Sequence, residues 1–149
     1  MTDSFFVDTN ILVYTRDASD AHKQKQAAAW MSELWREKTG RVSFQVLNEF
    51  YVTVTQKLRP GMDKKSARED VRCLLTWHPT PVDTSVIEGG WRLQDRYNLT
   101  WWDALIVAAA QMSACRYLLT EDLSENQKFD DVKVINPFTL PPGSIAKER

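Results

Sequence analysis

The sequence contains few of the residues that build disulfide-bonded or zinc-binding proteins. It has two cysteines and two histidines among 149 residues. Cys73 and Cys115 do not have the spacing of a metal site, and neither do His22 and His78. We therefore expect two free, packed thiols in a reducing compartment, and histidines that lie at the surface.

Long hydrophobic runs and targeting segments are also missing. No apolar run approaches the ~18 residues of a membrane span, and residues 1–4 lack the basic start of a signal peptide. We therefore expect a cytoplasmic protein with no membrane partner. The formal net charge is −1, which is not the balance of a protein that binds nucleic acid through bulk charge. A polynucleotide substrate would need local positive patches and bound metal.

Several catalytic motifs are absent as well. The chain has no glycine-rich phosphate loop of the Walker type, which argues against hydrolysis of nucleoside triphosphates. It has no G-x-S-x-G nucleophile elbow. An aspartyl-phosphate phosphatase would need a second aspartate at position 10, where this chain has Asn10.

The residues that are present predict one α/β domain. Hydrophobic residues make up 43% of the chain and charged residues 26%, as in an ordinary globular protein. We expect strands at residues 5–7, 41–43, 116–119 and 132–135, and helices at about residues 11–15, 20–38, 47–58, 63–77, 85–97 and 100–113. This alternation predicts a central parallel β-sheet covered by helices on both faces. The domain spans residues 1–138, and residues 139–149 form a loose C-terminal tail.

Local signals give some of the helix boundaries and the buried faces. Gly40 is interpreted as the stop of the second long helix, and Ser85 and Thr100 as starts of later ones. Trp30 and Trp91 lie in helices and are expected in the core. The second long helix has one apolar face, which consists of Ala27, Trp30, Met31 and Leu34.

Four acidic residues interrupt hydrophobic segments, and we call them the acidic quartet: Asp8, Glu49, Asp103 and Asp122. Charged side chains are seldom buried without a partner. Asp8 and Asp122 lie just beyond the ends of expected strands, where parallel sheets bind their ligands. Each acid also has a purely structural interpretation. Asp8 could cap a helix, Asp103 could belong to a capping box, Asp122 could be a turn residue and Glu49 could lie on a solvated helix face.

As a cluster, the acidic quartet points to a divalent cation. Grouped carboxylates repel one another, so a cluster that stays ionised needs a compensating positive charge. Oxygen ligands without a set of cysteines or histidines favour Mg²⁺ or Mn²⁺ over Zn²⁺. Such ions activate water and neutralise phosphate oxygens. Metal-dependent phosphodiester hydrolysis is therefore the chemistry that the residues favour.

A set of short motifs, in a fixed order, resembles a known family. The segments are residues 6–14 (FVDTNILVY), 48–50 (NEF), 102–106 (WDALI), 119–123 (LTEDL) and 134–138 (VINPF). Together they resemble the PIN-domain ribonucleases, and the chain is most similar to the stand-alone, VapC-like toxins of type II toxin–antitoxin systems. The resemblance covers residues 5–138 and implies an α/β/α sandwich. It also implies a Mg²⁺- or Mn²⁺-dependent endoribonuclease that acts on RNA, forms a homodimer and binds a small antitoxin protein.

The resemblance also assigns roles to residues. The acidic quartet matches the catalytic and metal-binding acids of the family, with Asp8, Asp103 and Asp122 binding metal directly or through water. Glu49 either binds metal or orients the attacking water. Asn10 and Thr120 match supporting polar positions. Glu121 is a rival for Asp122, and the motif alignment favours Asp122. Residues 124–128 lack the glycine that family members often have in this loop.

Other residues suggest contacts with RNA or protein. Arg16, Lys64 and Arg68 are candidates for binding RNA phosphates. The tryptophans expected to be partly exposed could stack on bases or form a protein interface; they are Trp35, Trp101 and Trp102. Two alternatives to a toxin stay open. One is a PIN-type nuclease of RNA processing or decay without an antitoxin, and the other is a non-catalytic RNA- or protein-binding domain of the same fold.

Overall fold

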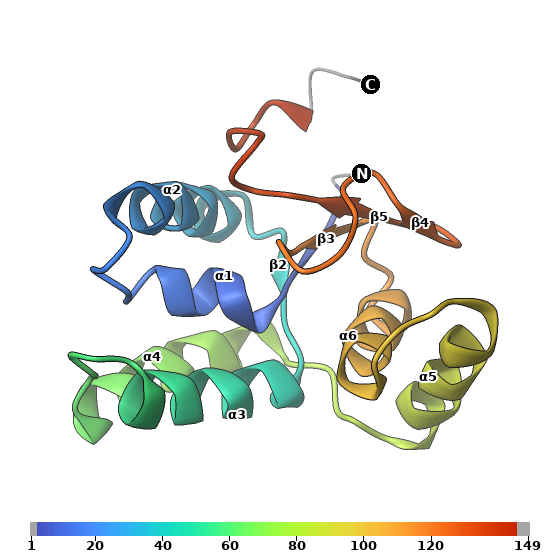
Figure 1. Cartoon of the computed structure of the whole chain (residues 1–149), viewed down its shortest axis with the longest axis horizontal. Helices are drawn as coiled ribbons and strands as arrows, with labels where there is room; N and C mark the ends of the chain where they lie inside the picture. Colours follow the sequence, from blue (N-terminus) through green and yellow to red (C-terminus); the bar gives the residue numbers. More distant parts are fainter. Residues whose placement is uncertain (1–2, 146–149) are drawn as a thin grey trace.

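A computed structural model describes residues 3–145 as an α/β domain built on a five-stranded sheet (Figure 1). The elements in chain order are β1 (Phe5–Val7), α1 (Thr9–Tyr14), α2 (Ala21–Glu37), β2 (Gly40–Arg41), α3 (Phe44–Val52), η1 (Thr53–Lys57), α4 (Lys64–Leu74), η2 (Leu75–Trp77), α5 (Thr84–Arg96), α6 (Trp101–Met112), β3 (Tyr117–Leu119), β4 (Lys128–Phe129) and β5 (Val132–Ile135). The sheet order is β2-β1-β3-β5-β4, and only β4 runs antiparallel to its neighbour. The expected α/β fold with a central parallel sheet is confirmed, and the antiparallel strand β4 is an addition to it.

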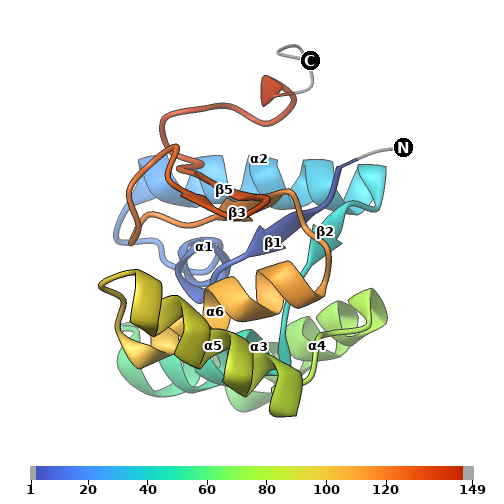
Figure 2. The same ribbon diagram turned by 90° about the vertical axis from the view of Figure 1, so that its right-hand side faces the viewer.

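Helices cover both faces of the sheet. Helix α2 lies on one face, and α5 and α6 lie on the other (Figure 2). The predicted apolar face of α2 is buried, and Trp30 packs against Phe5 of β1 with ring centroids 5.6 Å apart. Residues 104–110 of α6 are all buried, because this helix lies between the sheet and α5. The first turn of α6 therefore has a fixed position at the edge of the sheet.

The end of α2 differs from the prediction. The C-cap is Lys38, which adopts the left-handed conformation (φ 59°), and its N–H donates to the carbonyl of Leu34. Gly40 instead lies in β2. A Cβ atom at Gly40 would stand 2.3 Å from the ring of Trp77. Glycine is needed here for the close approach of a tryptophan rather than to end a helix.

Three further expectations about local structure are wrong. Helix α5 begins after Asp83, not Ser85, since the Asp83 side chain accepts a hydrogen bond from the Val86 N–H (3.1 Å). Trp91 is 56% exposed rather than in the core, and Cys73 is exposed rather than packed.

Strand β4 was not expected, because two residues give no periodicity to detect. Thr100 caps α6 as predicted.

The segment after β5 packs on the domain as far as the structure describes it. The Trp30 indole N–H donates to the carbonyls of Pro137 (3.0 Å) and Leu140 (2.9 Å), and Ile145 is buried. The segment is therefore held against α2 as far as Leu140, and Ile145 belongs to the buried core, while residues 146–149 lie outside the described residues. Within residues 3–145, no helix is long and apolar enough to span a membrane.

Candidate active site

A pocket of about 370 Å³ at the carboxyl ends of β1 and β3 brings the whole acidic quartet together. Asp8 follows β1, Asp122 lies in the loop after β3, Glu49 is on α3 and Asp103 is in the first turn of α6. Two larger hollows, of about 740 and 850 Å³, lie elsewhere on the domain and contain none of these acids. We place the candidate site in the smaller pocket because its lining carries the chemistry.

Asp8 is the most deeply placed acid, with 7% of its surface exposed. One carboxylate oxygen caps α1 by accepting from the Thr9 N–H (2.7 Å), and the other accepts from the Thr120 hydroxyl (2.8 Å). Burial raises the pKa of Asp8 to about 7, helped by the negative charges of Asp122 and Asp103 and opposed by the two hydrogen bonds. Asp8 is therefore both the N-cap of α1 and a residue of the pocket.

Thr120 and Asn10 connect Asp8 and Asp122. The fully buried Thr120 hydroxyl donates to Asp8 and accepts from the Asp122 N–H (3.1 Å). The side-chain amide of Asn10 donates to an Asp122 carboxylate oxygen (2.8 Å). Both residues predicted to be supporting thus contact acids of the quartet directly.

Glu49 is held by a residue to which the sequence analysis assigned no role. The Thr9 hydroxyl donates to one Glu49 oxygen (2.6 Å), which links α1 to α3. The other Glu49 oxygen has only a long contact (3.4 Å) with the side-chain amide of Gln45. Gln45 lies one helical turn before Glu49, a spacing that could have signalled the contact. Nothing in the sequence marks the Thr9 contact, because it depends on how α1 and α3 pack.

Asp103 completes the pocket from α6. The Thr100 side chain accepts from the Asp103 N–H (3.2 Å), and the Asp103 carboxylate is half-buried. Partial burial raises the pKa of Asp103, and the charges of Asp122 and Glu49 raise it further. The acids of the quartet therefore repel one another across the pocket.

The pocket suits an oxygen-seeking cation in its charge and its donor atoms. The side-chain oxygens of Asn10 and Gln45 are buried and have no hydrogen-bond partner. Both residues line the pocket beside the carboxylates. Among residues 3–145, no group of three or more Asp, Glu, His or Cys side chains has the geometry to coordinate a metal ion as it stands. The fit therefore rests on the mutual repulsion of the acids and on these unsatisfied oxygens.

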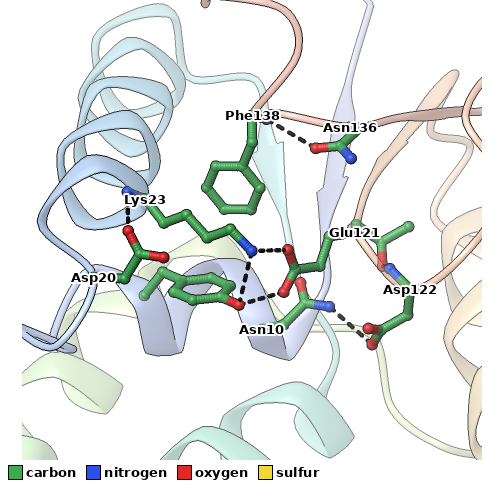
Figure 3. A network of polar contacts seen from close by, with 9 residues as sticks. Asn10, Asp20, Lys23, Glu121, Asp122, Asn136 and Phe138 are labelled. Atoms are coloured by element: carbon green, nitrogen blue, oxygen red, sulfur yellow. Dashed lines mark hydrogen bonds and ion pairs between the residues drawn. The ribbon is translucent and has the colours of Figure 1, made fainter.

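Asp122 and its neighbour Glu121 point in different directions (Figure 3). Asp122 lines the pocket and contacts Asn10. Glu121 instead accepts hydrogen bonds from Lys23 (2.7 Å) and from the Tyr14 hydroxyl, and it does not line the pocket. The geometry thus puts Asp122, and not Glu121, with the other three acids.

The basic candidates for RNA binding lie outside the pocket lining. The Arg16 guanidinium pairs with Asp70 of α4 through two hydrogen bonds of 2.7 Å each. Lys64 is exposed, and Arg68 donates to the Tyr51 hydroxyl (3.1 Å). Trp102, which is 62% exposed, is the expected aromatic residue that does reach the pocket.

The fold and this pocket define a class: an α/β domain with an acid-lined site at the carboxyl edge of a mostly parallel sheet. Residues 5–133 match the family model of the PIN domain. The chain belongs to the PIN domain family, which confirms the resemblance seen in its motifs. No curated protein matches the sequence.

Solved structures with the same fold include several from toxin–antitoxin systems. The structure of FitAB bound to an IR36 DNA fragment is 21% identical, covers 93% of this chain and 99% of that chain, and has a TM-score of 0.68. A toxin–antitoxin complex from Klebsiella pneumoniae is 20% identical over 90% of this chain and 98% of that chain (TM-score 0.64). Mycobacterium tuberculosis VapC20, a toxin that cleaves the sarcin–ricin loop, is 19% identical over 77% and 87% (TM-score 0.57).

Proposed function

We propose that this PIN domain is a Mg²⁺- or Mn²⁺-dependent endoribonuclease and the toxin of a toxin–antitoxin pair. The observation that carries the proposal is the meeting of four carboxylates, from four separate segments of the chain, in one pocket. Among the described residues, none of the four acids forms an ion pair with a lysine or arginine, and Asp8, Glu49 and Asp103 are buried or partly buried. Acids that share one pocket without a cationic partner favour a site built for an added cation.

The acidic quartet would hold the metal. Asp8, Asp103 and Asp122 would bind it directly or through water. Glu49 has one oxygen held by Thr9 and one nearly free, so it can bind the metal or accept a proton from the attacking water. When bound, a divalent ion activates water and stabilises the leaving oxygen of a phosphodiester.

The surrounding residues would keep the acids in place during catalysis. Thr120 orients Asp8 through its hydroxyl, and Asn10 orients Asp122. The exposed Trp102 at the pocket offers a face on which a base of the RNA can stack. Lys64 and Arg68 of α4 would contact phosphates farther along the RNA. So would the Nη1 group of Arg16, which takes no part in the two hydrogen bonds to Asp70.

The resemblance of the motifs to the family supports RNA as the substrate, an antitoxin partner and a homodimer, and the structural neighbours add support for the first two. VapC20 cleaves the sarcin–ricin loop, and two other neighbours are a toxin–antitoxin complex and FitAB on DNA. We extend these properties to the present chain as part of the proposal.

The proposal is tested by incubating the purified protein with total RNA and Mn²⁺ or Mg²⁺. We expect the wild type to cleave, and Asp8→Asn and Asp103→Asn to lose activity at least a hundredfold. Glu88→Gln, on the exposed surface of α5, is the matched control and should cleave like the wild type. Equal cleavage by all variants, or cleavage that survives a chelator, contradicts the metal mechanism.

A second experiment separates a toxin from a nuclease of RNA processing. Expression of the wild type, but not of Asp103→Asn, should arrest bacterial growth. Co-expression of a small DNA-binding protein encoded beside this gene should restore growth. That protein should also co-purify with the domain. Active nuclease that causes no arrest contradicts the toxin role and leaves the processing alternative.

A further inference from the structure

Glu121 occupies the position next to Asp122 but takes part in a separate set of contacts. We infer that Glu121, Lys23 and Tyr14 form a tie that positions Asp122 for metal binding, so that Glu121 is a positioning residue of the site. This inference rests on the proposed function, because it concerns the same metal site.

The tie joins three segments of the chain, and Phe138 from a fourth packs against it. Lys23 on α2 forms an ion pair with Glu121 (2.7 Å), and the Tyr14 hydroxyl on α1 donates to the second Glu121 oxygen. The Lys23 ammonium lies 5.0 Å from the centre of the Tyr14 ring and 5.2 Å from that of Phe138. The Tyr14 and Phe138 rings meet edge to face, with their centroids 5.2 Å apart. Each oxygen of Glu121 therefore has its own donor, and the cation has two aromatic faces.

The tie and the pocket share one helix and one pair of neighbouring residues. Asn10 and Tyr14 are one turn apart on α1, so they project from the same face of that helix. Asn10 binds Asp122 while Tyr14 binds Glu121. The contacts thus close a ring that runs from Asp122 through Asn10, along α1 to Tyr14, and back through Glu121. A rotation of the loop that carried Asp122 out of the pocket would therefore break two hydrogen bonds at once. These are the bond from Asn10 to Asp122 and the bond from Tyr14 to Glu121.

Lys23 has a second effect on the site. A free Glu121 carboxylate beside the pocket would offer the metal a competing ligand. Because Lys23 compensates the charge of Glu121 and directs it toward α2, Asp122 is left as the acid of this loop that faces the pocket. Burial, and after it the hydrogen bond to Glu121, raises the pKa of Tyr14, so its hydroxyl stays protonated and continues to donate.

Mn²⁺ affinity, measured by electron paramagnetic resonance, is the direct test. We expect Glu121→Gln to weaken Mn²⁺ binding about tenfold, and Tyr14→Phe, which keeps the ring but removes the hydroxyl, to weaken it about threefold. The double variant should lose about as much Mn²⁺ affinity as Glu121→Gln alone, because both changes remove the same contact. Its loss should be smaller than the product of the two single losses, which is what independent effects would give. RNA cleavage should show the loss in kcat, with KM for RNA nearly unchanged.

The matched control is Glu125→Gln. Glu125 lies in the same loop and accepts a hydrogen bond from Thr139 (2.5 Å), but it does not line the pocket. Its substitution should leave Mn²⁺ affinity within twofold of the wild type. Thermal unfolding of every variant checks that each is folded. If Glu121→Gln does not fold, the Mn²⁺ affinity of Tyr14→Phe tests the tie.

The outcomes separate the two claims. Wild type that binds Mn²⁺ while folded Glu121→Gln and Tyr14→Phe bind it equally well overturns the tie and leaves the metal site standing. A Glu125→Gln variant that weakens binding as much as Glu121→Gln also overturns the tie, because loop stiffness in general would then explain the effect. Wild type that binds no Mn²⁺ overturns the proposed function and this inference together.

Discussion

Thr120 supplies one hydroxyl to two parts of the site. It donates to Asp8 and accepts from the backbone N–H of Asp122, and it is fully buried. A buried hydroxyl with both functions in use cannot be replaced by an apolar group without leaving partners unsatisfied.

Thr120→Val, which keeps the shape and removes the hydroxyl, should therefore lower the free energy of unfolding by about 1–3 kcal/mol. Chemical denaturation measures this loss. Thr120→Ser keeps the hydroxyl and should cost only about 1 kcal/mol for the missing methyl group. Mn²⁺ affinity should fall in the valine variant and hold in the serine variant; the reverse order would contradict the assigned contacts.

Asp8 makes the metal-free protein sensitive to pH. Its pKa is raised from 3.8 to about 7 by burial, so the folded state holds a proton that the unfolded state has released between pH 4 and 7. The free energy of unfolding of the metal-free protein should therefore fall as pH rises through this range and level off above it.

The contribution of Asp8 is measured by comparing urea unfolding of the wild type and Asp8→Asn in chelator at pH 4.5 and pH 8. The difference should favour the variant at pH 8, because asparagine carries no charge to bury. Adding Mn²⁺ at pH 8 should stabilise the wild type and not the variant. A wild type that gains stability relative to the variant as pH rises would falsify the assignment.

At the scale of the elements, α5 and α6 pack through two adjacent glycines with different surroundings. A Cβ atom at Gly90 would meet the Trp101 ring at 2.8 Å, whereas one at Gly89 would meet the Ala108 Cβ at an ordinary 3.4 Å. Trp101 begins the helix that carries Asp103. The Gly90 contact therefore bears on both packing and the site.

Gly90→Ala should destabilise the protein and reduce cleavage, because Trp101 and the start of α6 must move. Gly89→Ala has the same gain in helix propensity, up to about 1 kcal/mol, without the clash. It should leave thermal stability equal or higher and cleavage unchanged. Equal behaviour of the two variants in both measurements would show that the Trp101 contact does not constrain α6.

The elements also show which features a sequence can reveal. Periodicity located α2, and the capping signal at Thr100 located α6. The residues that follow β1 and β3 were placed at the correct edge of the sheet. All of these signals lie in neighbouring residues of the sequence. The start of α5 was wrong since Asp83 and Ser85 are both plausible caps, and only the fold selects one. The roles of Thr9, Tyr14 and Lys23 depend on contacts between elements distant in the chain, which periodicity does not report.

For the whole molecule, the net charge of −1 limits how the proposed RNA substrate could be held. Bulk attraction is weak, so contacts near the pocket must supply much of the affinity. Two tryptophans have similar exposure, Trp102 at 62% and Trp91 at 56%, but only Trp102 lines the pocket.

Trp102→Ala should raise KM for RNA about tenfold, as expected for the loss of one stacked base worth roughly 1–3 kcal/mol. Mn²⁺ affinity should not change. Trp91→Ala is the control and should leave KM unchanged. If both variants raise KM equally, the tryptophans act through a general effect on the domain rather than through stacking at the pocket.

The order of strands in the sheet has a consequence for biosynthesis. Strand β3 inserts between β1 and β5, and the Asn10–Asp122 hydrogen bond joins residues 112 positions apart. The ribosome has therefore translated residues 1–121 before the last acid of the pocket exists. Under the proposed function, a stalled nascent chain or a proteolytic fragment that ends before Asp122 cannot assemble the nuclease.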